Sequence, residues 1–150
     1  MYEALLAAHI LCAVLWAGGG VTLHVLGRRA VKAGPEAAVS FSEAAGPVGS
    51  QIYAPLSALL VIFGVLLVGE AGFEHSDPWI GFAYVAWLIA FVLGAAVYPR
   101  VLKRVDGAVA EHGRSSAEAA GHVRTFLTLN TIEITLLLLV VVDMTVKPGA

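Results

Sequence analysis

Two histidines lie in the first apolar segment of the chain, where an imidazole needs a chemical explanation. His9 and His24 both fall within LLAAHILCAVLWAGGGVTLHVLGRRA, residues 5–30. An imidazole binds metal ions and haem iron through a ring nitrogen. On one α-helix the two residues are separated by about 22 Å along the axis, because each residue adds about 1.5 Å. They therefore cannot bind the same metal ion, but each can belong to a separate site near one face of a membrane.

His9 is the first candidate for a functional ligand. A helical bundle holds haem between facing helices, usually with an imidazole as an axial ligand. The glycines at 18–20 carry no side chains, so a flat macrocycle or a partner helix can approach the chain there. Two simpler interpretations remain open. In these, His9 hydrogen-bonds a neighbouring helix, and His24 extends its ring to the inner headgroups.

The last apolar segment carries its own polar residues. Asn130 and Glu133 lie one helical turn apart and share a face. Glu133 is expected near mid-bilayer, where a charged group costs roughly 2.5–3.5 kcal/mol, so it is either protonated and hydrogen-bonded or part of a proton path. Asp143 is expected at a depth close to that of His9. It either orients the imidazole, as a carboxylate does for a metal-bound histidine, or reaches the outer headgroups.

A copper site is the alternative to haem. Met144 offers a thioether beside Asp143, and the loop GEAGFEHSDPW offers the imidazole of His75 among acidic residues. Thioether and imidazole groups are ligands that suit copper. The alternative metal site therefore comprises His9, Met144 and His75, although acidic residues are also ordinary on the outer face of a membrane protein.

The composition is that of a membrane protein and indicates how these residues are positioned. Of the 150 residues, 59% are hydrophobic and 13% are charged, whereas a soluble domain is about 25% charged. A single cysteine excludes an intrachain disulfide and a multi-thiolate metal site. Nucleotide-binding loops, nucleophile elbows and features of nucleic-acid binding are absent from the sequence.

The apolar pattern predicts an all-α, integral membrane four-helix bundle formed by a single domain, residues 1–150. A span requires about 20 largely apolar residues. Four segments meet this requirement, at about 4–26, 51–69, 79–99 and 125–146. The stretch 35–49 is expected to form a short helix on the cytoplasmic surface, and 106–123 to prolong the third helix or precede the fourth.

Basic residues predict the orientation. Eight of the nine Lys and Arg residues lie in the segments 27–49 and 100–124. Because such residues are retained on the cytoplasmic side, both termini and the loop 70–78 are expected on the outer side. Tyr2 and Trp79 are expected at the outer interface, and Phe41, Tyr53 and Tyr98 near the inner one.

Two motifs carry a family resemblance. AHILCAVLWAGGG places His9 seven residues before Trp16, with small residues following, and the chain ends in LLLLVVVDMTVKPG. These features resemble a superfamily of small four-helix membrane proteins. It includes HemJ-type protoporphyrinogen oxidases, the membrane part of CopD copper-resistance proteins, and a related family of integral membrane proteins of unknown function.

The resemblance implies a bundle with a functional His9, in which Trp16, Gly19, Asn130 and Glu133 match further positions. For the HemJ type it also implies a bound b-type haem and porphyrinogen oxidation. The Pro-Arg pair of that type is absent from TLHVLGRR, and the pattern of the last helix is altered to NTIE. The resemblance therefore supports the bundle and a haem more than the oxidase activity.

The leading prediction is a bundle in the bacterial inner membrane that binds haem b for electron transfer or HemJ-like oxidation, with enzymatic activity left open. The candidate cofactor-binding residues are His9, His24, Trp16, Gly19, Glu133 and Asp143. If His24 is also a ligand, the same helix of a second chain completes both sites in a homodimer. The alternatives are a CopD-like copper-handling protein and a non-catalytic accessory subunit of a larger membrane complex, which binds its neighbour through small residues at 18–20 and 94–96.

Overall fold

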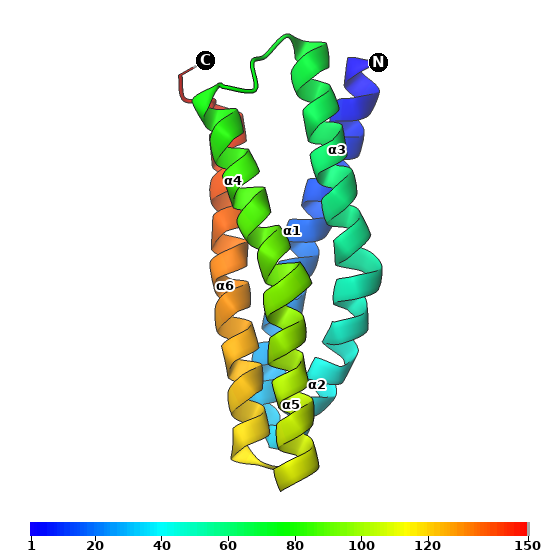
Figure 1. Ribbon diagram of the computed structural model, residues 1–150, viewed down its shortest axis with the longest axis vertical. Helices are drawn as coiled ribbons and strands as arrows, with labels where there is room; N and C mark the ends of the chain where they lie inside the picture. Colours follow the sequence, from blue (N-terminus) through cyan, green and yellow to red (C-terminus); the bar gives the residue numbers. More distant parts are fainter. Residues whose placement is uncertain (150) are drawn as a thin grey trace.

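The chain folds into long helices that run side by side (Figure 1). The computed structural model describes residues 1–149, and within that range it contains no strand. The elements are α1 (Tyr2–Ala33), α2 (Pro35–Val48), η1 (Gly49–Tyr53), α3 (Ala54–Ala71), α4 (Pro78–Val92), η2 (Leu93–Val97), α5 (Tyr98–His112) and α6 (Ala117–Val146). The two η elements are π-helical turns inside longer helices.

Among the described residues, four continuous helices are long and apolar enough to cross a membrane: Tyr2–Ala33, Pro35–Ala71, Pro78–His112 and Ala117–Val146. The second and third each combine two α-helices through a π-helical turn. Large apolar side chains lie exposed on the outside of the bundle, for example Leu11 at 62% and Val14 at 61%. A surface of this kind is stable in lipid, which is as apolar as the side chains themselves. The expected all-α bundle with four apolar helices is therefore confirmed.

Both termini and the loop between α3 and α4 lie at one end of the bundle, which we call the terminal end (Figure 1). The other end, the turn end, holds the connections from α1 to α2 and from α5 to α6. Gly34 and Gly113 end helices there with φ of 131° and 83°, and glycine adopts such backbone angles without steric cost. Ser116 then caps α6 by accepting a hydrogen bond from the Ala119 amide at 3.2 Å.

The structure corrects the predicted organisation of residues 27–49. Residues 27–33 continue α1, and α2 continues through η1 into α3 instead of lying apart on a surface. The helix Pro35–Ala71 has 37 residues, which is about 55 Å and longer than the roughly 30 Å of hydrocarbon. Residues 106–112 prolong the third long helix, and residues 117–123 begin the fourth, as predicted.

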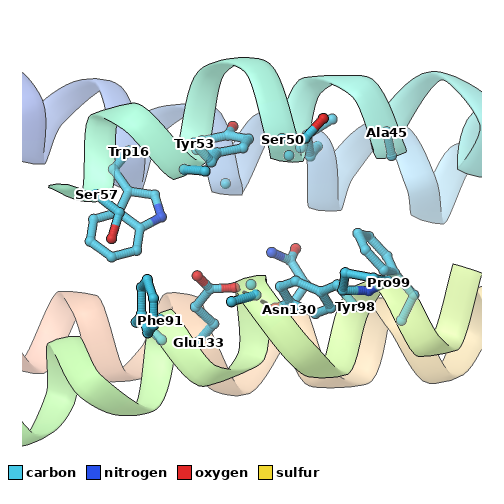
Figure 2. Close-up of a pocket in the computed structure, with 18 of the residues that line it drawn as sticks. Trp16, Ala45, Ser50, Tyr53, Ser57, Phe91, Tyr98, Pro99, Asn130 and Glu133 are labelled. Atoms are coloured by element: carbon cyan, nitrogen blue, oxygen red, sulfur yellow. Dashed lines mark hydrogen bonds between the residues drawn. The ribbon is translucent and has the colours of Figure 1, made fainter.

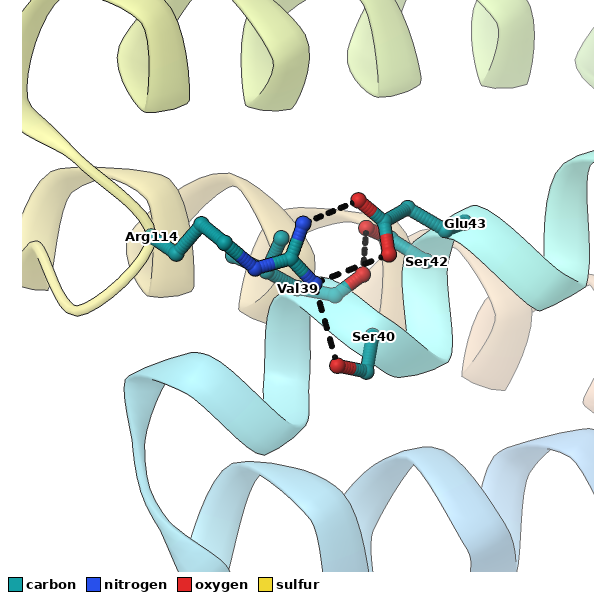
Figure 3. Close-up of polar contacts among 5 residues, drawn as sticks. All are labelled: Val39, Ser40, Ser42, Glu43 and Arg114. Atoms are coloured by element: carbon teal, nitrogen blue, oxygen red, sulfur yellow. Dashed lines mark hydrogen bonds and ion pairs between the residues drawn. The ribbon is translucent and has the colours of Figure 1, made fainter.

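A core of small side chains closes the turn end. It joins α2, α5 and α6, and its fully buried members are alanines and valines: Ala38, Val39, Val105, Ala108, Ala119, Ala120 and Val123. Small residues permit this close approach of three helices. A polar contact covers the core (Figure 3): the Arg114 guanidinium donates to the Glu43 carboxylate at 2.9 Å and to Ser40 Oγ at 3.2 Å. The hydrogen bonds to Glu43 raise the pKa of Arg114 above its ordinary value.

Candidate functional site

A cavity of about 460 Å³ lies between α1, α3, α4 and α6 in the terminal half of the bundle. Its volume falls in the range of small-molecule and cofactor sites, about 300–1,000 Å³. We call it the His9 cavity. Its walls are largely apolar and aromatic, and its aromatic members are Tyr2, Trp16, Phe73, Trp79, Tyr84 and Trp87.

His9 is held in one orientation by α3. Its Nδ1 atom lies 3.0 Å from the carbonyl oxygen of Leu60. A carbonyl oxygen only accepts hydrogen bonds, so Nδ1 carries the hydrogen and Nε2 keeps its lone pair. Gly64, one turn further along α3, makes room for the ring, because an added Cβ would lie 3.1 Å from His9 Cε1. His9 thus hydrogen-bonds a neighbouring helix through Nδ1, and this bond does not use Nε2.

Three further groups give the His9 cavity chemical character. Met144 of α6 lines the same cavity as His9. Lys147, which ends α6, places its Nζ atom 4.5 Å from the centre of the Phe73 ring and 5.3 Å from that of Trp79. Trp79 is 5% exposed, and its buried Nε1 atom has no hydrogen-bond partner among the described residues. Trp79, in the first turn of α4, is therefore a buried residue with a free donor.

In this structure His9 is paired with the Leu60 carbonyl and not with Asp143. The described structure contains no hydrogen bond between His9 and Asp143, and Asp143 does not line the His9 cavity. One carboxylate oxygen of Asp143 is buried without a partner in the described chain. The Leu60 carbonyl performs the orienting role that the sequence had suggested for this carboxylate.

His24 and His75 both lie outside the His9 cavity. His24 is half-buried on α1, and its Nδ1 atom has no partner among residues 1–149. His75 is exposed in the loop between α3 and α4, and its Nδ1 atom lies 2.7 Å from the hydroxyl of Tyr84, a cavity residue. Within residues 1–149, no three His, Cys, Asp or Glu side chains come close enough to hold a metal ion.

A second cavity, of about 320 Å³, lies nearer the turn end and is more polar. We call it the Glu133 cavity (Figure 2). Glu133 and Asn130 of α6 line it, and each is only 6% exposed. Tyr98, at the start of α5, donates a hydrogen bond to the Glu133 carboxyl. The sequence predicted that Asn130 and Glu133 share a face. It placed Tyr98 near the inner membrane interface, so the hydrogen bond from Tyr98 to the Glu133 carboxyl was not predicted.

The glycines of α1 serve helix packing. A Cβ atom at Gly19 would clash with the hydroxyl of Tyr53, and one at Gly20 would lie 3.5 Å from Ile134. Gly18 faces open space, and none of the three lines the His9 cavity. Of the two alternatives, a flat macrocycle or a partner helix, Gly19 makes room for the helix that carries Tyr53. Trp16, which is 5% exposed, lines both cavities.

Comparison with known proteins identifies a family. No curated protein and no solved structure matches the chain. A family model described as "Predicted integral membrane protein (DUF2269)" matches residues 3–148. Because this match covers nearly the whole chain, the protein belongs to that family and is a multi-pass integral membrane protein embedded in a lipid bilayer.

Proposed function

We propose that this protein binds haem b in the His9 cavity and serves electron transfer or an oxidation of the HemJ type. The observation that carries the proposal is the hydrogen bond from His9 Nδ1 to the Leu60 carbonyl, 3.0 Å long, which leaves Nε2 available. Haem- and metal-binding histidines commonly use this arrangement, because the backbone bond fixes the tautomer and the ring orientation.

The residues around His9 fit a haem. The walls are apolar and aromatic, as the faces of a porphyrin require, and Gly64 leaves space beside the imidazole. The unpartnered Nε1 donor of Trp79 and the ammonium group of Lys147 lie on the same cavity. Both groups can bind the propionates, a charge-assisted contact in the case of Lys147.

Met144 is the residue that would hold the haem iron together with His9. It is a thioether that lines the cavity of His9, and His/Met ligation gives haem iron a raised reduction potential. Haem supplies one-electron redox chemistry when bound. The residues of this chain hold the imidazole in one tautomer, exclude water with aromatic walls and bind anionic groups at the terminal end. The homodimer in which His24 acts as a ligand is a separate hypothesis, because His24 lines neither cavity of the single chain.

The proposal includes an orientation in the bacterial inner membrane. The turn end carries Arg28, Arg29 and Lys32 on α1 and Lys103 and Arg104 on α5, whereas Lys147 lies at the terminal end. The excess of basic residues favours the turn end in the cytoplasm and both termini outside. The His9 cavity then lies toward the outer face.

The test is an absorption spectrum of the detergent-purified protein, oxidised and then reduced with dithionite, after expression with supplied haem. We expect a Soret band and sharpened α and β bands on reduction, lost in His9→Ala. His24→Ala is the matched control, because this histidine lies on the same helix but lines neither cavity. A featureless wild-type spectrum, or a haem spectrum that survives His9→Ala, contradicts the proposal.

Copper handling is the second candidate, favoured by the presence of His9 and Met144 on one cavity. An imidazole and a thioether together suit Cu(I). This candidate predicts copper by elemental analysis without a Soret band, and loss of copper in both His9→Ala and Met144→Leu. The accessory-subunit alternative has no comparable support, because Gly18 faces open space and Gly94 lines the Glu133 cavity.

A further inference from the structure

Both π-helical turns of the chain lie on the Glu133 cavity. In η1 the Ala54 amide bonds to the Gly49 carbonyl, and in η2 the Tyr98 amide bonds to the Leu93 carbonyl. Each turn is followed closely by a proline, Pro55 or Pro99, which has no amide hydrogen to continue the regular helical pattern. π-Helical turns occur frequently at functional sites. Here two of them, from helices far apart in the sequence, contribute residues to one cavity.

The Glu133 cavity opens sideways between η1 and η2. Six of its lining residues are exposed on the outside of the bundle: Ser50, Ala54, Phe91, Gly94, Ala95 and Pro99. Most of these residues are small, and a Cβ atom at Gly94 would meet nothing within 4 Å. Because the long helices stand in a bilayer, this opening faces lipid. A ligand that dissolves in the membrane can reach the cavity without crossing water.

The inner end of the cavity offers hydrogen bonds that the chain does not use. The buried Oδ1 atom of Asn130 has no partner among residues 1–149, although the residue is 94% buried. Figure 2 shows its amide and the Glu133 carboxyl directed between the helices, with the Tyr98 ring beside them. An amide, a carboxyl and a phenol together can donate to a carbonyl oxygen and accept from a hydroxyl group. A buried polar atom without a partner is costly in hydrocarbon, which favours a bound ligand that completes its bonding.

The walls select a flat, uncharged ligand. Aromatic rings of Trp16, Phe91, Tyr98 and Phe126 line the cavity, and the rings of Tyr98 and Phe126 lie 4.8 Å apart. Its described lining residues include no Lys, Arg or His, so the cavity offers no cation to bind a phosphate headgroup or a carboxylate. A volume of about 320 Å³ accommodates one substituted ring, with an apolar tail left in the lipid.

We propose that the Glu133 cavity binds the ring of a lipid-soluble quinone or quinol, which enters from the bilayer between η1 and η2. Asn130, Tyr98 and Glu133 bind the ring oxygens. The binding itself does not require haem; the role of this ligand as a redox partner rests on the proposed function.

The test is a titration of the purified protein with decylubiquinone in detergent, followed by quenching of tryptophan fluorescence, because Trp16 lines the cavity. Wild type is expected to show saturable binding of one quinone. Gly94→Leu places a larger side chain at the opening of the cavity, where an added Cβ atom meets nothing within 4 Å. This variant is expected to bind quinone at least tenfold more weakly. Gly81→Leu is the matched control, since Gly81 lies on α4, faces open space and lines neither cavity.

Asn130→Leu provides an independent variant that removes the unpartnered amide, and it too is expected to weaken binding at least tenfold. Quenching that does not saturate, or that is equal in wild type and Gly94→Leu, reports partition into micelles and overturns the proposal. The same titration on His9→Ala separates this proposal from the haem proposal. Saturable binding there supports the quinone site whatever the haem spectrum shows, and a haem spectrum without saturable binding overturns the quinone site alone.

Discussion

Trp16 of α1 and Leu137 of α6 line both cavities, so these two side chains form the wall between the His9 cavity and the Glu133 cavity. Trp16 is also among the most buried large residues of the bundle, at 5% exposure. The arrangement places the candidate haem site and the candidate quinone site on opposite sides of one indole. The Trp16 ring would prevent direct contact between a haem and a quinone, while holding the two ligands only one side chain apart.

Trp16→Ala is expected to destabilise the bundle by about 3 kcal/mol, because removal of a buried indole leaves a void that merges the two cavities. Trp16→Phe retains most of the wall and is the control. Unfolding in detergent with increasing denaturant measures both variants. Equal stability of Trp16→Ala and Trp16→Phe would show that the indole does not support the wall.

Gly64→Val is expected to weaken haem binding at least tenfold. A Cβ atom alone at this position would lie 3.1 Å from His9 Cε1, and the branched side chain must displace the imidazole from the Leu60 carbonyl. Gly69→Val lies on the same helix and meets open space, so haem binding should be unchanged there. A haem titration that monitors the Soret band measures the haem affinity of both variants. Equal affinities would show that Gly64 does not contribute to the haem site.

Tyr98→Phe removes the hydroxyl that donates to Glu133 and leaves a buried carboxyl without that partner. We expect the free energy of unfolding in detergent to fall by about 1 kcal/mol, because hydrogen bonds between helices in membranes contribute modestly to stability. A double-mutant cycle with Glu133→Gln measures the coupling. If the two changes are additive, the side chains do not stabilise each other.

The sequence predicted much of the architecture because lipid imposes simple rules. Each span needs an unbroken apolar helix, and four such segments are visible in the composition alone. The continuation of α2 into α3 was missed because Gly34, Pro35 and Pro47 look like loop residues. Pro35 begins a helix at a position where no amide hydrogen is needed. Pro47 lies just before the π-helical turn η1.

The candidate site was less predictable because partners across helices depend on which helices are neighbours. His9 stood out as an ionisable residue within an apolar segment, but its partner is a backbone carbonyl, that of Leu60, which has no sequence signal. Gly64, a residue without a side chain in an apolar segment, gave only a weak indication that another side chain packs closely there. Tyr98 and Trp79 fitted the aromatic-belt pattern, yet Tyr98 lines the Glu133 cavity and Trp79 lines the His9 cavity.

The proposed orientation of the bundle leads to a labelling prediction, for which the single cysteine is an advantage. Cys12 is buried, and Cys12→Ala provides a background free of thiols. In that background, Ser76→Cys tests the exposed loop between α3 and α4, and Ser115→Cys tests the exposed turn between α5 and α6. Because basic residues concentrate at the turn end, a membrane-impermeant maleimide added to intact spheroplasts should label position 76 and not position 115.

Permeabilised membranes should give labelling at both positions, which controls for access to each thiol. Labelling of position 115 alone in intact spheroplasts would reverse the orientation and place the His9 cavity toward the cytoplasm.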